Sequence, residues 1–338
     1  MTLLAQKRFE NKISGRVTNV ETDAPLFNVN VFLANTTRGD ATDKDGYYLI
    51  ENIPPGAYDL VFSMIGFELE IVSVQMFGTE SIECHKKLRP RILKGKEVEV
   101  VSSLPKDWKK NLKKFTAAFI GQSKNADQCR LINPEVLDFH VDDKADYFIA
   151  TTDSILIVEN RALGYRIHTI LDTFRLSKDN LIYAIHPRYE ELTPEHEKQR
   201  KNWLKNRNRT YRGSFRHFLA ALCQDKLEQE GFYVFDLHGN LLKKDVFSFL
   251  PETNRALKWL CFYKPVEVVY DGAYRIIYGR YFRVGASGSH SSYLYLKKDF
   301  ALIDTSGNVY TKFAFIHSGY WFNERIADKL PFDYTPDR

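Results

Sequence analysis

The stretch that decides the fold lies between Ile13 and Phe67 and reads ISGRV (13–17), APLFNVNVFL (24–33) and ATDKDGYYLIENIPPGAYDLVFSMIGF (41–67). Val29, Val31 and Leu33 fall at every second position, as do Tyr47 and Leu49, and this is the period of half-buried strands. Asp45-Gly46 is a hairpin turn signal, and Pro54-Pro55-Gly56 is a second break in the chain. The stretch therefore predicts short strands joined by tight turns.

The order of these elements resembles the carboxypeptidase regulatory-like domain, a small β-sandwich related to the transthyretin-like (prealbumin-like) fold. The resemblance rests on Gly15, Pro25-Leu26, the turn from Thr42 to Tyr47, Pro55-Gly56-Ala57-Tyr58 and Ile65-Gly66-Phe67. In that family the domain is appended to carboxypeptidases and is not itself the catalytic unit. The resemblance thus implies a fold and no reaction.

Three regions follow from the pattern of strands and breaks. Residues 9–90 form the sandwich, residues 91–105 form a linker with a short strand at Glu97–Val100, and residues 106–338 form a larger domain. The last region alternates strands and turns, including two D-x-x-G-N tips at Asp236–Asn240 and Asp304–Asn308, which are hairpin signals. We expect a mainly β protein, with a sandwich followed by a β-rich α+β domain that carries a helical insertion.

Helices are expected near residues 106–121 and 194–230. In the first, Trp108, Leu112, Phe115 and Phe119 recur at helical spacing, while four lysines lie outside that stripe. It reads as a helix packed on the second domain or as a membrane-surface helix. In the second, Thr193 is expected to cap and Pro194 to occupy the first turn. A further helix starts after Ser214 and ends at Gly231.

A wider resemblance covers nearly the whole chain. It is to Gram-negative envelope proteins with the same N-terminal sandwich, and it rests on residues 131–134, 157–165, 206–207, 211–214, 217–218, 319–321 and 325–331. It implies an exported protein in the periplasm, the outer membrane or at the cell surface. The first residues, MTLLAQ, look like the tail of a secretory signal without its basic and apolar regions.

The composition of the chain restricts which classes of binding partner are expected. The chain has 338 residues, 14% of them aromatic, and a formal net charge of +5. This charge permits contact with anionic surfaces but does not demand nucleic acid, which we do not expect as a partner. A run of 18 apolar residues is absent, so the sequence predicts no transmembrane helix. Four widely spaced cysteines lack a C-x-x-C pair and favour buried thiols, or one disulfide in an exported protein.

Signals for catalysis are weak. No histidine is followed three positions later by glutamate, so the zinc-ligand pair of a carboxypeptidase is missing and no cofactor is expected. Asp138, His140 and Asp142 fall at every second position of an expected strand. They form either a metal-binding cluster or the solvent-exposed face of an amphipathic strand. Asp40, Asp43 and Asp45 suggest either a calcium loop or a turn. Residues 285–290, GASGSH, place serine near histidine but read as a flexible loop.

One segment stands out as a candidate binding surface. Its eight cations are interleaved with aromatic residues, and no acidic residue interrupts them. The candidate contact residues are Lys198, Arg200, Lys201, Trp203, Lys205, Arg207, Arg209, Tyr211, Arg212 and Arg216. Such a segment contacts an anionic glycan, a lipid headgroup or a protein, or else it is a solvated helix whose arginines pair within the fold.

These observations favour a non-catalytic envelope protein that binds or scaffolds a protein or an anionic glycan or lipid. The alternative is a hydrolase that acts on peptide or glycan through the C-terminal domain. That alternative requires histidine and carboxylate side chains that converge in one pocket.

Overall fold

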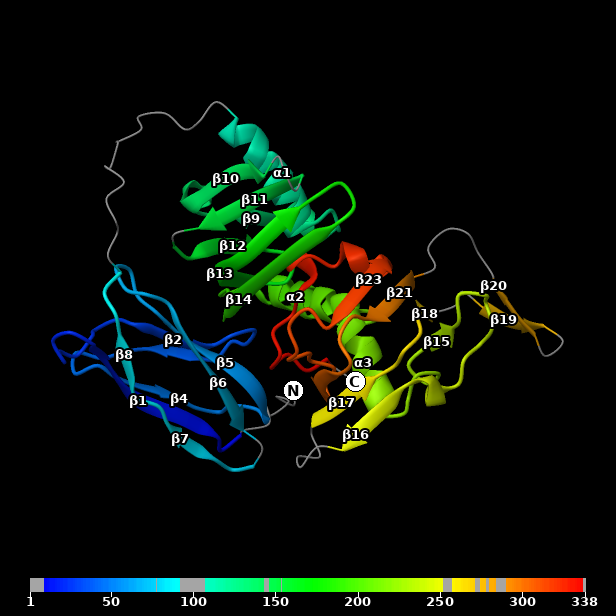
Figure 1. The fold of residues 1–338 in the computed structure, drawn as a ribbon, viewed down its shortest axis with the longest axis horizontal. Coiled ribbons are helices and arrows are strands. Elements are labelled where there is room, and N and C mark those ends of the chain that lie inside the picture. Colours follow the sequence, from blue (N-terminus) through cyan, green and yellow to red (C-terminus); the bar gives the residue numbers. More distant parts are fainter. Residues whose placement is uncertain are drawn as a thin grey trace. The chain divides into compact units, whose positions relative to one another are not determined.

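A computed structural model describes residues 9–76, 78–91, 107–142, 146–152, 154–251, 257–270, 274–277, 280–283 and 290–336. The chain divides into two compact units (Figure 1). Unit 1 comprises residues 1–118, 129–160 and 164–193, and unit 2 comprises residues 119–128, 161–163 and 194–338. The expected strand at 97–100 and the GASGS part of the loop at 285–290 lie outside the described residues.

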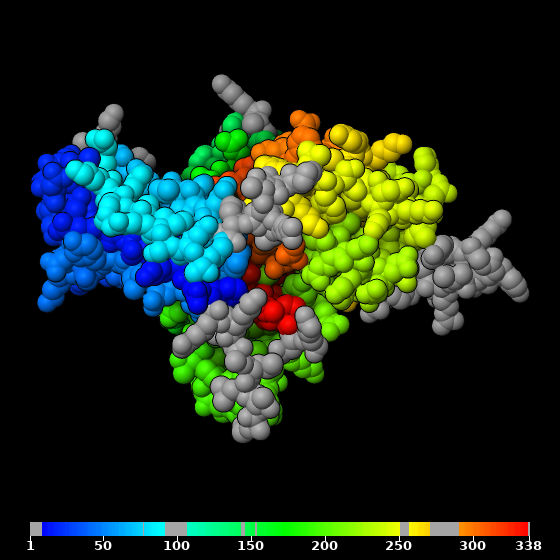
Figure 2. Space-filling view, turned by 90° about the horizontal axis from the view of Figure 1, so that it is seen from below, coloured from blue at the N-terminus to red at the C-terminus, as the bar shows by residue number. Residues whose placement is uncertain are grey.

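The first part of unit 1 is a sandwich of two four-stranded sheets. One contains β4-β1-β7 in that order, with β8 also on β1, and the other has the order β3-β2-β5-β6. The strands are β1 (Lys12–Asn19), β2 (Asn30–Leu33), β3 (Gly39–Ala41), β4 (Tyr47–Ile50), β5 (Gly56–Ser63), β6 (Glu70–Met76), β7 (Ser81–Glu83) and β8 (Lys86–Leu88). In Figure 2 these residues form a blue-to-cyan surface.

Buried residues alternate along β1, as the sequence predicts, whereas β2 and β5 are buried on both faces, because Phe32 and Val61 form a second cluster against which Ile170 packs. Ile13 and Val17 of β1 share one buried cluster with Val31 and Leu33 of β2. On β4, however, Tyr48 and Ile50 are the buried residues, whereas Tyr47 and Leu49 are 51% and 46% exposed. The turn at Asp43–Gly46 forms, but it connects strands of different sheets, since β3 pairs with β2 and β4 pairs with β1.

The acidic residues of this turn are occupied by backbone donors. Asp43 Oδ1 accepts hydrogen bonds from the amides of Asp45 and Tyr47, at 2.9 and 2.8 Å. Asp40 accepts from the amides of Ala41 and Leu49. These carboxylates therefore stabilise the turn, which is the simpler of the two interpretations of the sequence.

The rest of unit 1 is an antiparallel six-stranded sheet of order β10-β11-β13-β12-β9, with β14 on β13. Its strands are β9 (Cys129–Leu131), β10 (Leu137–Asp142), β11 (Tyr147–Thr152), β12 (Leu156–Asn160), β13 (Tyr165–Leu176) and β14 (Leu181–Glu191). The sandwich is hydrogen-bonded to β14, because Asn35 N–H donates to the Pro187 carbonyl and Tyr189 N–H donates to the Thr36 carbonyl.

Helix α1 (Trp108–Ile120) lies along one face of this sheet (Figure 1). Phe115 packs 5.9 Å from Phe139 of β10 and 4.7 Å from Phe174 of β13, measured between ring centroids. The indole of Trp108 donates to the Leu137 carbonyl at 3.0 Å. The apolar stripe is thus covered by protein, as expected of a packed helix, while the lysines at 109, 110, 113 and 114 are exposed.

The polar residues that alternate along β10 face solvent. Asp138, His140 and Asp142 are exposed, while Phe139 packs on Phe148 with centroids 5.5 Å apart. Among the residues that the structure describes, no group of three His, Cys, Asp or Glu side chains could hold a metal ion. These three side chains therefore form the solvent-exposed face of an amphipathic strand.

Unit 2 contains helices α2 (Glu197–Tyr211) and α3 (Phe215–Cys223) and two larger sheets, of order β15-β18-β21-β23 and β16-β17-β22. Its strands are β15 (Phe232–Phe235), β16 (Ser248–Pro251), β17 (Leu257–Cys261), β18 (Val266–Tyr270), β19 (Tyr274–Ile277), β20 (Arg280–Arg283), β21 (His290–Leu296), β22 (Ala301–Asp304) and β23 (Phe315–Gly319). The core forms where Phe218 and Leu222 of α3 meet Val268, Leu294 and Trp321. The protein is mainly β, as predicted.

Several boundaries in unit 2 differ from the sequence-based expectation. Helix α2 is capped by His196, whose Nδ1 accepts from the Gln199 amide, and not by Thr193. Helix α3 ends at Cys223 rather than near Gly231. After the first D-x-x-G-N tip, the chain forms a short 3-10 turn, Lys244–Val246, before β16.

The four cysteines do not form disulfides; Cys223 and Cys261 are buried, and Cys84 and Cys129 are partly exposed. None of the helices among the described residues is long and apolar enough to cross a membrane.

Candidate functional site

The inward face of α2 is fixed by hydrogen bonds to three consecutive carbonyls. Trp203, Arg207 and Tyr211 follow at four-residue intervals and are only 6%, 6% and 9% exposed. Trp203 Nε1 donates to the carbonyl of Arg161 at 2.8 Å, and Arg207 Nε donates to that of Leu163 at 2.7 Å. Asn206 Nδ2 donates to the Ala162 carbonyl between them, at 2.9 Å. The helix and segment 161–163 are therefore held in a single register within unit 2.

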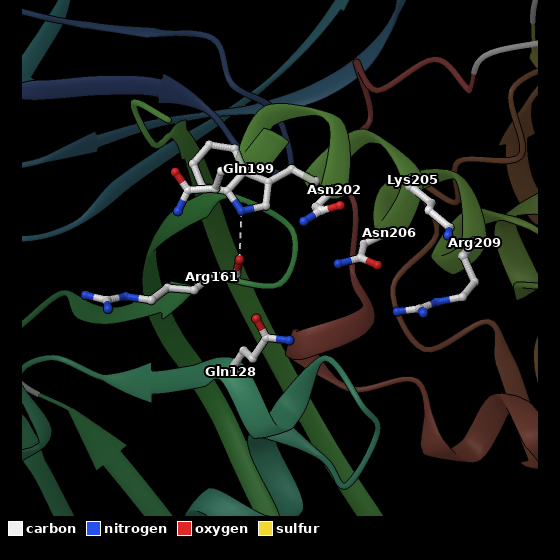
Figure 3. Close-up of a pocket in the computed structure, with 8 residues that line it drawn as sticks. Gln128, Arg161, Gln199, Asn202, Lys205, Asn206 and Arg209 are labelled. Carbon is white, nitrogen blue, oxygen red and sulfur yellow. Dashed lines mark hydrogen bonds between the residues drawn. The ribbon is translucent and has the colours of Figure 1, made fainter. Parts of the chain in front are cut away.

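Beside this contact lies an open hollow of about 480 Å³ (Figure 3). Its lining contains four carboxamides, three cations and one indole, and it contains no carboxylate. The lining residues are Gln128, Arg161, Gln199, Asn202, Trp203, Lys205, Asn206 and Arg209. All of them belong to unit 2. An open site lined by cations without acids attracts anions, because no lining charge opposes them.

The walls of the hollow come from separate parts of the sequence. Asn202, Lys205, Asn206 and Arg209 extend from α2, and Gln128 points toward them from the opposite side (Figure 3). Gln128 ends a short 3-10 turn, and its carbonyl accepts from the Arg161 amide at 3.0 Å. This bond ties two lining segments together, so the walls are positioned by backbone and not by mobile side chains alone.

A network of hydrogen bonds holds the side chain of Arg209. Its Nη2 donates to Asn125 Oδ1 at 3.3 Å, and the buried Asn125 donates through Nδ2 to Thr210 Oγ1 and Asp328 Oδ1, each at 2.8 Å. Ser123 Oγ also donates to Asp328 Oδ1, at 2.9 Å. Burial raises the pKa of Asp328, although these hydrogen bonds favour its charged form. The network orients the guanidinium toward the hollow.

The ten candidate contact residues therefore do not form one surface. Trp203, Lys205 and Arg209 line the hollow, while Arg207 and Tyr211 are buried on the inward face. Lys198 and Lys201 are exposed outside the lining.

The remaining three arginines of the candidate set are bonded within the fold. Arg200 pairs with Glu197 at 2.7 Å, and Arg212 Nε donates to Asn208 Oδ1 at 3.1 Å. Arg216 donates to the carbonyls of Ser306, Pro331, Phe332 and Tyr334. Helical periodicity thus separates cations that the sequence places together, and Arg216 acts on the C-terminal segment instead.

Five lining residues escaped the sequence analysis: Gln128, Arg161, Gln199, Asn202 and Asn206. Four are uncharged, and Gln128 and Arg161 are far from α2 along the chain. One signal was available, because Asn202 and Asn206 lie four residues apart, as do Lys205 and Arg209, and such pairs share a helix face.

Titratable side chains elsewhere in unit 2 bear on the hydrolase alternative. Glu324 Oε1 accepts from the Phe215 amide at 3.1 Å, and burial raises the pKa of Glu324 to about 7. Burial, with Lys329 and Arg325 nearby, lowers the pKa of His317 to about 3. His317 Nδ1 is buried without a hydrogen-bond partner.

His217 contacts a carboxylate, Glu230. Its Nδ1 accepts from the Gly213 amide at 3.1 Å, and its Nε2 lies 3.2 Å from Glu230 Oε2. The accepting Nδ1 requires the tautomer with the proton on Nε2, which donates to Glu230. Burial lowers the pKa of His217, which is consistent with a neutral ring. Both ring nitrogens are thereby used in bonds at the start of α3.

Comparison with known proteins identifies the N-terminal part. Residues 13–100 match the family model of the CarboxypepD_reg-like domain. This agrees with the β-sandwich and with the resemblance noted in the sequence. A search of curated proteins finds no match.

Solved structures give only distant likenesses. A type II cohesin–X-dockerin complex from Acetivibrio cellulolyticus is 20% identical, with 22% of this chain and 52% of that chain covered and a TM-score of 0.20. A Bacteroides uniformis protein described as carbohydrate-binding is 10% identical over 58% of this chain and 84% of its own, with a TM-score of 0.21. The major pilin subunit of Bacillus cereus is 11% identical over 84% and 95%, with a TM-score of 0.19. TM-scores this low establish neither fold nor function.

Proposed function

We propose that this protein is a non-catalytic binding or scaffolding protein of the Gram-negative cell envelope, and that it holds an anionic partner at the α2 hollow. The observation that carries the proposal is the lining itself, with Arg161, Lys205 and Arg209 present and no carboxylate among the eight residues. The CarboxypepD_reg-like domain supports a non-catalytic role, since it accompanies activities rather than performing them. The envelope location is supported by the resemblance of several sequence segments to envelope proteins.

Binding of an anion at this hollow is a surface interaction and is therefore modest. Lys205 and Arg209 are both exposed. Each exposed ion pair contributes about 0.2–1 kcal/mol, so removing both charges weakens binding by about 2- to 30-fold. Affinity should also fall as salt increases, because ions screen exposed charges.

The test compares two double variants of the full chain. Lys205→Gln with Arg209→Gln removes two lining cations, and Lys198→Gln with Lys201→Gln removes two exposed lysines of the same helix outside the lining. Both variants change the net charge equally. Binding of anionic glycans and anionic vesicles should weaken in the first variant and persist in the second. Equal losses in both variants would refute the hollow as the site.

The hydrolase alternative has one observation in its favour, the pKa of Glu324 near neutrality, which is a property of general acids and bases. Its Oε1 is engaged by the Phe215 amide, and we assign it a structural role. Hydrolysis of peptide or glycan substrates by the purified chain that is lost in Glu324→Gln would overturn the non-catalytic proposal.

A further inference from the structure

The hydrogen bonds already made around the hollow restrict what a ligand must supply. Asn206 gives one Nδ2 hydrogen to the Ala162 carbonyl, so its acceptor Oδ1 and its second Nδ2 hydrogen are left for a ligand. Gln199 Oε1 accepts from the Glu195 amide at 2.7 Å, which leaves the donor Nε2 and the second lone pair of Oε1. Trp203 has no donor to offer, because its Nε1 is bonded to the Arg161 carbonyl. The lining therefore presents both donors and acceptors at defined places.

A simple anion pairs with the hydrogen-bond donors of the lining but not with its acceptors. Phosphate diesters, sulfates and carboxylates offer acceptors, which suit Lys205 and Arg209 but leave the Asn206 oxygen without a donor. Hydroxyl groups both donate and accept, and therefore pair with carboxamides such as Asn202 and Gln128. A ligand that bears several hydroxyls and a negative charge satisfies the whole lining.

Size and openness agree with such a ligand. A hollow of about 480 Å³ falls within the roughly 300–1,000 Å³ of small-molecule sites, and it is open rather than enclosed. An open site also accepts a segment of a longer chain. We propose that the hollow binds an acidic saccharide, with its anionic group on Lys205 and Arg209 and its hydroxyls on the carboxamides. This inference rests on the proposed anion-binding function and names its ligand class.

The test uses three probes that separate charge from hydroxyls. Trigalacturonate carries both, its methyl ester keeps the hydroxyls and loses the charges, and tricarballylate keeps three carboxylates without a hydroxyl. Calorimetric or ligand-observed NMR titration of the full chain at low salt should rank trigalacturonate above its methyl ester by about 2- to 30-fold, as expected when two exposed ion pairs are lost. It should rank trigalacturonate above tricarballylate by about 10-fold or more, as expected when several hydrogen bonds of about 1 kcal/mol are lost.

Variants assign the two contributions to named side chains. Gln128→Ala with Asn202→Ala should weaken trigalacturonate about 5-fold or more and leave tricarballylate unchanged. Lys205→Gln with Arg209→Gln should weaken both. Lys198→Gln with Lys201→Gln is the charge-matched control, since both lysines are exposed on the same helix outside the lining, and it should change neither.

The outcomes separate the proposal of an acidic saccharide ligand from the proposal that the hollow binds anions. Equal affinity for tricarballylate and trigalacturonate, dependent on Lys205 and Arg209, would overturn the saccharide assignment and leave anion binding intact. Binding to anionic lipid vesicles without trigalacturonate binding would do the same. Absence of binding to every anionic probe at low salt would overturn both.

Discussion

The two D-x-x-G-N tips provide a matched pair for testing how unit 2 packs. In each, the aspartate Oδ1 accepts from the amides two and four residues later, and its Oδ2 accepts from the asparagine side chain. Gly239 and Gly307 occupy the same place, with φ of +83° and +80°. A Cβ at Gly239 would meet nothing within 4 Å, whereas one at Gly307 would lie 2.0 Å from the Arg216 carbonyl oxygen and 2.8 Å from the Ala220 nitrogen.

These geometries give different expected costs for alanine. The left-handed backbone costs an L-residue about 1 kcal/mol at either position. At Gly307 the new methyl group also overlaps the backbone of α3, which cannot rotate away, and overpacking of this kind costs about 1–3 kcal/mol more. We therefore expect Gly239→Ala to lower the free energy of unfolding by about 1 kcal/mol and Gly307→Ala to lower it by about 2–4 kcal/mol.

Urea unfolding followed by tryptophan fluorescence measures this difference in the full chain. Trp203, Trp259 and Trp321, three of the four tryptophans, belong to unit 2. The Gly307→Ala transition should have the lower midpoint with an unchanged slope. Losses that agree within about 0.5 kcal/mol would refute the close approach of this tip to α3, because the backbone term alone would then account for both variants.

Three further predictions concern pH, α2 and the sandwich. Burial raises the pKa of Glu324 to about 7 from 4.5, so the folded state keeps this proton longer than the unfolded state, and stability falls as pH rises between these values. Glu324→Gln should remove up to about 3 kcal/mol of this fall in the free energy of unfolding, so the variant should be more stable than the wild type at pH 8. The control variant Glu228→Gln, at an exposed position, should leave the pH profile of urea midpoints unchanged. Trp203→Phe should cost about 1 kcal/mol in urea unfolding followed by circular dichroism, because the bond to the Arg161 carbonyl is lost; an unchanged midpoint would contradict that contact's contribution. The fragment 9–90 should unfold cooperatively on its own, and a non-cooperative thermal transition would show that it depends on the rest of unit 1.

The sandwich was predictable because its information is local. Alternation and turn residues between Ile13 and Gly66 specify strands, and these signals act over a few residues. The face assignment on β4 was less secure, since Tyr47 and Leu49 are as apolar as Tyr48 and Ile50, and only packing chooses between them. Strands such as β9, Cys129–Leu131, were missed because three residues carry too little periodicity.

The candidate site was only half predictable. Charge density located α2, but burial of Arg207 and the carbonyl bonds of Arg216 depend on partners more than 40 residues away. Sequence alone does not reveal those partners, and it therefore counted structural arginines as available cations. Carboxamides such as Gln128 carry no charge signal, so their place in the lining emerged only from the fold.

The three carbonyls at 161–163 have a consequence for any attempt to divide this protein. Unit 2 gathers residues 119–128 and 161–163 in addition to everything after 193. A fragment that starts at Pro194 would carry α2 with its indole and guanidinium donors but without their acceptors, and without the opposite wall of the hollow. A single cut in the chain therefore does not release the complete site, because a contiguous fragment that keeps both residues 119–128 and α2 must also carry residues 129–160 and 164–193 of unit 1.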